Sequence, residues 1–131
     1  MKAGSRFPEA TLARIQKERI LGMRAGRNST HRVIGLWAVV VDDRVFVRSW
    51  SMKPRSWWRT LLEDPHGTIF VGQSKRGIRV RALQVQEEEL KERVSAAYRE
   101  KYNTRGSIGY VGDMSRAPSR DTTTELIPLR E

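Results

Sequence analysis

The sequence predicts a mainly β domain, a small antiparallel barrel of about six strands with two or three helices covering its ends. Three observations lead to this fold class. Most apolar segments are short, rich in β-branched residues and adjacent in the chain, as in antiparallel sheets. Few segments show helical periodicity. The 131 residues are enough for one domain with a modest core. We therefore expect a single domain over residues 1–131, with residues 1–7 flexible.

Local signals place the elements of the first half. Pro8-Glu9 predicts a helix start, since proline is favoured in the first helical turn. Residues 22–30 are expected to form a short strand that leads into a loop. The apolar run 33–41 predicts a strand that is buried on both faces or lies in a sheet curling on itself. Asp42-Asp43 predicts a hairpin turn, and residues 44–48 predict the returning strand.

Similar signals place the elements of the second half. Ser56 predicts the N-cap of a short helix that ends at Asp64-Pro65. Residues 87–102 give the strongest helix prediction, because acidic residues lead the segment and one face is apolar. Residues 103–119 are rich in Gly, Ser and Pro and are expected to form a long loop. Three more strands are predicted at residues 68–71, 78–85 and 122–129.

Composition narrows the classes of function. The chain has 25 Lys and Arg against 15 Asp and Glu, a formal charge of +10 that attracts nucleic acid, anionic membranes and phosphorylated small molecules alike. With no cysteine, no signal-peptide pattern and no long apolar run, we expect a cytoplasmic protein. His31 and His66 are interpreted as surface or structural residues, and no spacing indicates a metal site. An enzyme of this composition would take its chemistry from a cofactor.

The stretch 48–65 is the predicted ligand site. It holds three of the four tryptophans among cations and hydroxyls, and such a mixture suits a planar ring with an anionic tail. Trp37 is interpreted as a core residue, whereas for Trp50, Trp57 and Trp58 both packing and function stay open. The predicted cofactor-binding residues are Arg48, Ser49, Lys53, Arg55, Trp57, Trp58 and Arg59. The predicted substrate-side residues are Trp50, Tyr110 and Met114, the last two as a lid or substrate wall.

The order of these motifs resembles a known superfamily. The run Pro54-x-x-Trp57-Trp58-x-x-Leu61-x-x-Asp64-Pro65, placed between two strands, is similar to that of flavin-binding split barrels, including the pyridoxamine 5'-phosphate oxidase-like proteins and the deazaflavin-dependent nitroreductases. Over residues 10–129 the chain resembles an uncharacterised bacterial family placed with them. The resemblance implies a six-stranded split barrel and a homodimer. It also implies that Ser49, Lys53 and Arg55 lie on the phosphate side.

The chain departs from the nitroreductase pattern at two places. Thr60 stands where the pattern has Asn, and Trp50-Ser51-Met52 stands where it has glycines, so that bulk here would narrow a phosphate pocket. The implied function is binding of FMN or a deazaflavin coenzyme, with hydride transfer to or from a small organic substrate. We favour the deazaflavin because of Trp57-Trp58 and because an acidic coenzyme tail suits a basic surface.

Two other classes of function remain open. One is a non-enzymatic nucleic-acid-binding barrel that uses basic and Trp residues, although no motif of a known recognition module is present. The other is a barrel that has lost its cofactor and binds a different anionic metabolite.

Overall fold

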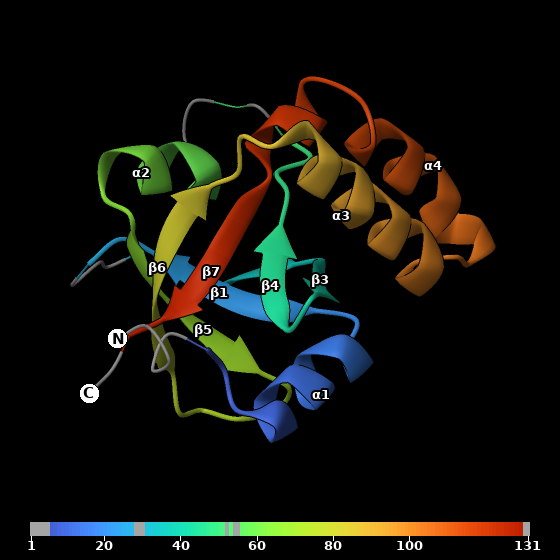
Figure 1. Cartoon of the computed structure of the whole chain (residues 1–131). Helices are drawn as coiled ribbons and strands as arrows, with labels where there is room; N and C mark the ends of the chain where they lie inside the picture. Colours follow the sequence, from blue (N-terminus) through green and yellow to red (C-terminus); the bar gives the residue numbers. More distant parts are fainter. Residues whose placement is uncertain (1–5, 28–30, 52, 54–55, 130–131) are drawn as a thin grey trace.

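Seven strands form one antiparallel sheet in the described part of the chain, surrounded by four α-helices and a short 3₁₀ helix (Figure 1). The computed structural model describes residues 6–27, 31–51, 53 and 56–129. The elements in chain order are α1 (Glu9–Lys17), β1 (Leu21–Ala25), β2 (Ile34–Leu36), β3 (Ala38–Val41), β4 (Arg44–Val47), α2 (Trp57–Glu63), β5 (His66–Val71), β6 (Ile78–Gln84), α3 (Glu88–Lys101), α4 (Arg105–Met114), η2 (Ser119–Thr122) and β7 (Thr124–Pro128).

The strand order β2-β1-β5-β6-β7-β4-β3 makes the sheet a nearly closed barrel. Its two edge strands, β2 and β3, are consecutive in the chain and are separated by Trp37 alone. The apolar run therefore crosses from one sheet edge to the other, pairing with β1 before Trp37 and with β4 after it. The sheet does curl on itself, and the fold is a split barrel. The predicted count of six strands is wrong because this run forms two strands.

Tyr98 of α3 and Tyr102, the residue that ends this helix, bind the chain at the point where it leaves one sheet edge and joins the other. The Tyr98 hydroxyl donates to the carbonyl of Trp37 at 2.6 Å. The Tyr102 hydroxyl lies 3.3 Å from the amide nitrogen of Ala38 and donates to the carbonyl of Arg19 at 2.7 Å. Because buried backbone groups need partners, these phenols replace the ladder hydrogen bonds missing at the break.

The core has two parts. The first fills the barrel with the inward side chains of the strands and is capped by Leu12 and Ile15 of α1 and Leu61 of α2. The second lies on the outer side of β3 and β4, where Val39 and Phe46 pack against α3 and α4. Figure 1 shows this helix pair beside β3 and β4. The position of α4 follows from this second core, since the helix buries one face there.

The predicted hairpin and three predicted helices are confirmed. Asp42 and Asp43 have φ of 53° and 61°, as a tight two-residue hairpin turn requires. Pro8 precedes α1, and the Ser56 side chain accepts from the amide of Arg59 at the start of α2. The predicted helix 87–102 is α3.

The predicted loop 103–119 is wrong, since residues 105–114 form α4. The prediction of two or three helices is therefore also wrong. No helix in the described ranges is long and apolar enough to cross a membrane.

Candidate functional site

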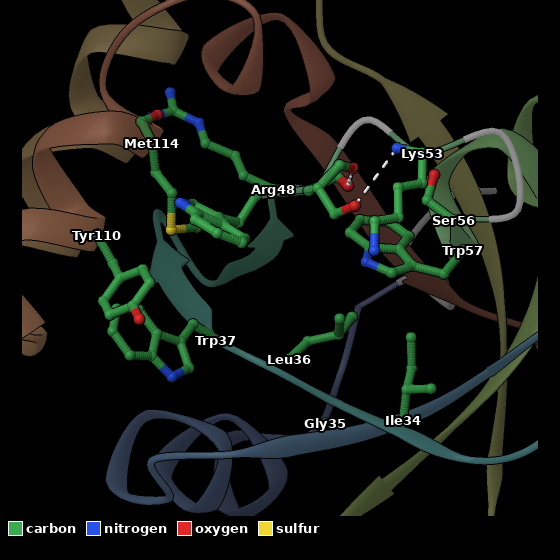
Figure 2. Close-up of a pocket in the computed structure, with 13 residues that line it drawn as sticks. Ile34, Gly35, Leu36, Trp37, Arg48, Lys53, Ser56, Trp57, Tyr110 and Met114 are labelled. Carbon is green, nitrogen blue, oxygen red and sulfur yellow. Dashed lines mark hydrogen bonds between the residues drawn. The ribbon is translucent and has the colours of Figure 1, made fainter.

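A cavity of about 520 Å³ lies where three parts of the chain meet (Figure 2). Small-molecule sites commonly have volumes of about 300–1,000 Å³. One wall comes from β2 and the break after it, another from the segment between β4 and α2, and the third from α4. The lining residues are Ile34, Gly35, Leu36, Trp37, Arg48, Ser49, Trp50, Ser51, Lys53, Ser56, Trp57, Tyr110 and Met114.

Four aromatic side chains line this cavity. Trp37 stacks on the buried Tyr102, with ring centroids 4.3 Å apart and 4° between the planes. Tyr110 meets Trp37 edge-on at 6.1 Å and Trp50 edge-on at 5.4 Å. Trp57 stands across the cavity from Tyr110 (Figure 2). The cavity thus offers flat apolar surfaces at both ends, which suits a planar ring system.

The polar groups gather near Trp57. Ser49, Ser51, Lys53 and Ser56 line the cavity there, and no lining residue is acidic. The Ser49 hydroxyl donates to the carbonyl of Ser51, and the Lys53 amide donates to the Ser51 hydroxyl at 3.3 Å. The Lys53 side chain is exposed, and none of the ion pairs among the described residues involves it. This end of the cavity can receive an anion.

Arg48 lines the cavity, but its guanidinium is bound to the protein. The guanidinium donates to the hydroxyls of Thr123 and Ser95, both at 2.8 Å. It also donates to the carbonyls of Met114 and Lys91, both at 2.7 Å. Burial lowers the pKa of Arg48 to about 10. These contacts make Arg48 a tie between β4 and the helical side of the molecule.

Two other predicted residues point elsewhere. The Trp58 indole N–H donates to Oε1 of Gln84 at 2.9 Å, and the Arg59 guanidinium lies 5.7 Å from the Trp58 ring centroid. Neither residue lines the cavity. Arg55 and Met52 lie outside the described residues.

The structure brings together six of the predicted residues from distant parts of the chain, in addition to Arg48. They are Ser49, Trp50, Lys53, Trp57, Tyr110 and Met114. Trp50 forms part of the cavity wall.

The sequence prediction missed Trp37 and the three residues of β2 as lining residues. A signal was present, because Trp37 is the one aromatic residue in an aliphatic run.

No histidine is among the residues that line this cavity. The described residues contain no cluster of three or more His, Cys, Asp or Glu that could hold a metal. His66 lies outside the cavity lining, with its Nδ1 3.2 Å from Oδ1 of Asp64 and 2.7 Å from the guanidinium of Arg27. Among the described residues, the lining offers a ligand aromatic rings for stacking, hydroxyls for hydrogen bonds and the exposed cation of Lys53.

The molecule is thus a nearly closed barrel with a cavity that is lined by aromatic and polar side chains. Residues 11–126 match the model of a family described as uncharacterized proteins conserved in bacteria, DUF2255. The chain belongs to this family, which confirms the predicted bacterial family. No curated protein matches the chain.

Three crystal structures illustrate the likeness of fold. The heme storage protein HutZ of Vibrio cholerae has a TM-score of 0.64 and 18% identity, with 94% of this chain and 91% of that chain covered. A putative pyridoxamine 5'-phosphate oxidase of Listeria innocua has a TM-score of 0.59 and 14% identity, with 94% and 92% covered. A FAD-binding protein of Mesorhizobium loti has a TM-score of 0.54 and 12% identity, with 93% and 88% covered. These neighbours show that this chain shares their fold.

Proposed function

We propose that this protein binds FMN or a deazaflavin coenzyme in the cavity and is an oxidoreductase acting on a small organic substrate. The observation that supports this most directly is the pairing of aromatic walls with an acid-free polar end containing Lys53. The fold neighbours include a FAD-binding protein, which is consistent with such a ligand. Heme, the ligand in the name of HutZ, has less support here, because no histidine or cysteine lines the cavity.

The residues present fit such a group. When bound, the cofactor ring would carry the hydride, and the protein would supply binding, orientation and electrostatics. Trp37, Trp57 and Tyr110 would hold the ring and exclude water from it. Lys53 and the hydroxyls of Ser49, Ser51 and Ser56 would bind the phosphate. Arg55, Trp58 and Arg59 stay predicted cofactor-side residues, and Arg48 would act by positioning Met114 and the end of β4.

The substrate would lie on the side of Trp50, Tyr110 and Met114. Trp50 and Tyr110 are 56% and 49% exposed, so they form the mouth of the cavity rather than its floor. The deazaflavin remains our preferred cofactor, since an acidic coenzyme tail leaving the cavity would meet a chain of charge +10.

Fluorescence titration tests the cofactor. We expect both ring fluorescence and protein fluorescence to be quenched when the apo protein is titrated with FMN or with a deazaflavin coenzyme. The matched pair Trp57→Leu and Trp58→Leu locates the ring, because both residues begin α2 but only Trp57 lines the cavity. Quenching should be lost in the first variant and kept in the second. Absence of quenching and of a thermal shift with both cofactors would remove the redox function.

Comparison of FMN with riboflavin tests the phosphate end. Lys53→Gln should weaken FMN about five- to ten-fold, since an exposed charge contact contributes about 1 kcal/mol. Riboflavin has no phosphate, so its affinity should not change. Equal effects on the two ligands would place the phosphate elsewhere, with Arg55 as the next candidate.

The two rival functions make different predictions for this cavity. A metabolite-binding barrel without a redox cofactor would bind phosphorylated compounds that lack a ring as well as it binds FMN. A nucleic-acid barrel that stacks bases on its tryptophans needs an open surface, whereas Trp37, Trp50 and Trp57 surround one cavity. The cavity therefore favours a small planar ligand.

A further inference from the structure

A groove of about 400 Å³ lies between α3 and α4, two helices that run side by side (Figure 1). It shares no lining residue with the cavity. Helix α4 separates the two hollows, because it turns by about 100° per residue. Tyr110 and Met114 are on its cavity side, whereas Ile108, Gly112 and Ser115 are on the opposite side and line the groove.

The base of the groove is apolar. Tyr102 and Val111 form this base and are buried, whereas Ile108 is 60% exposed. The groove stays open beside Gly112, where an added Cβ would have Nη1 of Arg116 as its nearest neighbour, at 3.7 Å. An apolar hollow of this size with a few polar groups is typical of a small-molecule site.

Two arginines line the groove, and no lining residue is acidic. Arg99 of α3 is exposed, and none of the ion pairs among the described residues involves it. Helix α3 offers it no carboxylate, since the residues one turn away are Ser95, Ala96, Tyr102 and Asn103. Arg116, just after α4, pairs with Asp113 at 2.9 Å, but both side chains are exposed, so this pair is weak.

The two arginines are at the same end of the groove. Ser95 of α3 and Met114 of α4 lie together, because the Ser95 hydroxyl and the Met114 carbonyl both accept from the Arg48 guanidinium. One groove arginine is a turn after Ser95, and the other is two residues after Met114. Ile108 is about 9 Å away from Met114 along the axis of α4. The groove therefore has a cationic end and an apolar end.

Such a groove is complementary to a ligand that has one anionic end and one apolar end. We propose that it binds an organic carboxylate with a hydrophobic body of about eight carbon atoms, a length that fits the roughly 9 Å between its two ends. The carboxylate accepts hydrogen bonds from the Arg99 guanidinium in bidentate geometry, and Arg116 adds a second positive charge. The hydrophobic body lies over Tyr102 and Val111 toward Ile108. This site is independent of the cofactor, because the two hollows share no residue.

Isothermal titration calorimetry with sodium octanoate tests the proposal. We expect one site with a dissociation constant of about 0.1–1 mM, as for a ligand of this size with one good charge contact. 1-Octanol and octylammonium have the same chain without the carboxylate. Each should bind at least about five-fold more weakly, since the contact with the arginines is lost.

Two matched pairs of variants locate the site. Arg99→Gln should weaken octanoate about five- to ten-fold, whereas Arg105→Gln, at an exposed residue of α4 outside the groove, should change its affinity less than about two-fold. Gly112→Leu fills the groove and should weaken octanoate more than about ten-fold. Gly109→Leu makes the same change at a helix position that lines neither hollow, and it should leave binding intact. Both glycine variants should melt at or above the wild-type temperature, because leucine has the higher helix propensity.

Each outcome of these titrations decides the proposal. Selective losses in Arg99→Gln and Gly112→Leu, with binding kept in their controls, support it. Equal losses within either pair, unchanged binding to Gly112→Leu, or octanol bound as well as octanoate would overturn it. A loss in Lys53→Gln but not in Arg99→Gln would place the carboxylate in the cavity and overturn it as well. So would a lack of saturable binding up to about 5 mM octanoate.

Discussion

Arg48 is a buried residue, with only 2% of its surface exposed. Its guanidinium donates hydrogen bonds to oxygen atoms of α3, of α4 and of the segment before β7. Its ring contact with Tyr98, at 5.8 Å to the centroid, adds a further tie to α3. A charge buried this deeply is tolerated because its donors are satisfied. From sequence, the same arginine looks like a phosphate ligand, since it ends a strand beside Ser49 and Trp50. What the sequence does not show is the set of oxygens that surround it after folding.

Replacing Arg48 with Met should destabilise the fold strongly. The hydroxyls of Ser95 and Thr123 and two carbonyls would lose a charged donor, at a cost of about 2–4 kcal/mol. Arg59→Met is the control, because Arg59 is exposed and should change stability by less than about 0.5 kcal/mol. Urea unfolding measures both variants. An unchanged midpoint for Arg48→Met, together with lost cofactor binding, would make Arg48 a ligand-binding residue.

Because of Lys101, the free energy of unfolding should rise with pH in the alkaline range. Its ammonium donates to the carbonyls of Ile15 at 2.9 Å and Ala38 at 2.7 Å, and burial followed by repulsion from Arg19 lowers its pKa to about 8. The unfolded value is near 10.4, so the unfolded chain binds more protons between about pH 8 and pH 10. Stability therefore increases through that window, by less than the limit of about 1.4 kcal/mol per pH unit because the side chain is partly solvated.

Urea unfolding at about pH 7.5, 8.5 and 9.5 measures this slope against a Lys101→Met control, in which the rise should disappear. The neutral amine keeps two N–H donors for its two carbonyls, so the contacts survive deprotonation. The increase in unfolding free energy should end above about pH 10. Burial raises the folded-state pKa of Tyr102 to about 12, and it raises the pKa of Tyr98 further. The unfolded tyrosines then ionise first and stability falls. A flat profile in the wild type would show that Lys101 stays charged.

At the scale of elements, the features that the sequence predicts correctly depend on near neighbours. The turn at Asp42-Asp43 and the cap at Ser56 each involve residues within a few positions. The break at Trp37 was missed because its hydrogen-bond donor, Tyr98, is 61 residues away. The same limit applies to the site. The prediction places Ser49, Lys53 and Trp57 in one site because they are near neighbours in the chain. It omits Trp37, which lies beside them only after the barrel has formed.

Helix α4 was missed because its glycines are typical of loops. Gly106 and Gly109 have no atom within 4 Å of an added Cβ, so packing does not explain them. Burial of Val111 and Met114 in the second core holds the helix despite the low helix propensity of its glycines. A helix of this kind is weaker than its length suggests, and it carries both Tyr110 and Met114 into the cavity wall.

Gly109→Ala should therefore stabilise the protein by up to about 1 kcal/mol, which is about 3–5 °C in melting temperature for a chain of this size. Gly77→Ala is the opposite control. Its added Cβ would collide with Cγ2 of Thr68, so this variant should lower the melting temperature. Thermal unfolding of the two variants checks the pair. A fall in melting temperature for Gly109→Ala would mean that this face of α4 is covered by something else in solution.

At the scale of the whole molecule, the cavity opens between apolar side chains. Ile34, Trp50 and Tyr110 at its mouth are 36%, 56% and 49% exposed. Ile20, 49% exposed, adjoins this rim, because its Cγ2 lies 2.8 Å from the ideal Cβ position of Gly35. Exposed apolar groups around a binding site commonly mark an interface. A second copy seated on this rim would close the cavity and complete the predicted homodimer.

The mass in solution tests this dimer. We expect the wild type to sediment at twice 15.1 kDa, about 30 kDa, at micromolar concentration. Ile20→Glu puts a charge on the rim at a residue that does not itself line the cavity, and it should give the 15.1 kDa monomer. Leu62→Glu, an equally exposed position on α2, should leave the dimer intact. Because the second copy would exclude water from the ring, FMN affinity should fall in the Ile20 variant alone. A wild-type monomer that binds FMN tightly would show that one chain is the complete site.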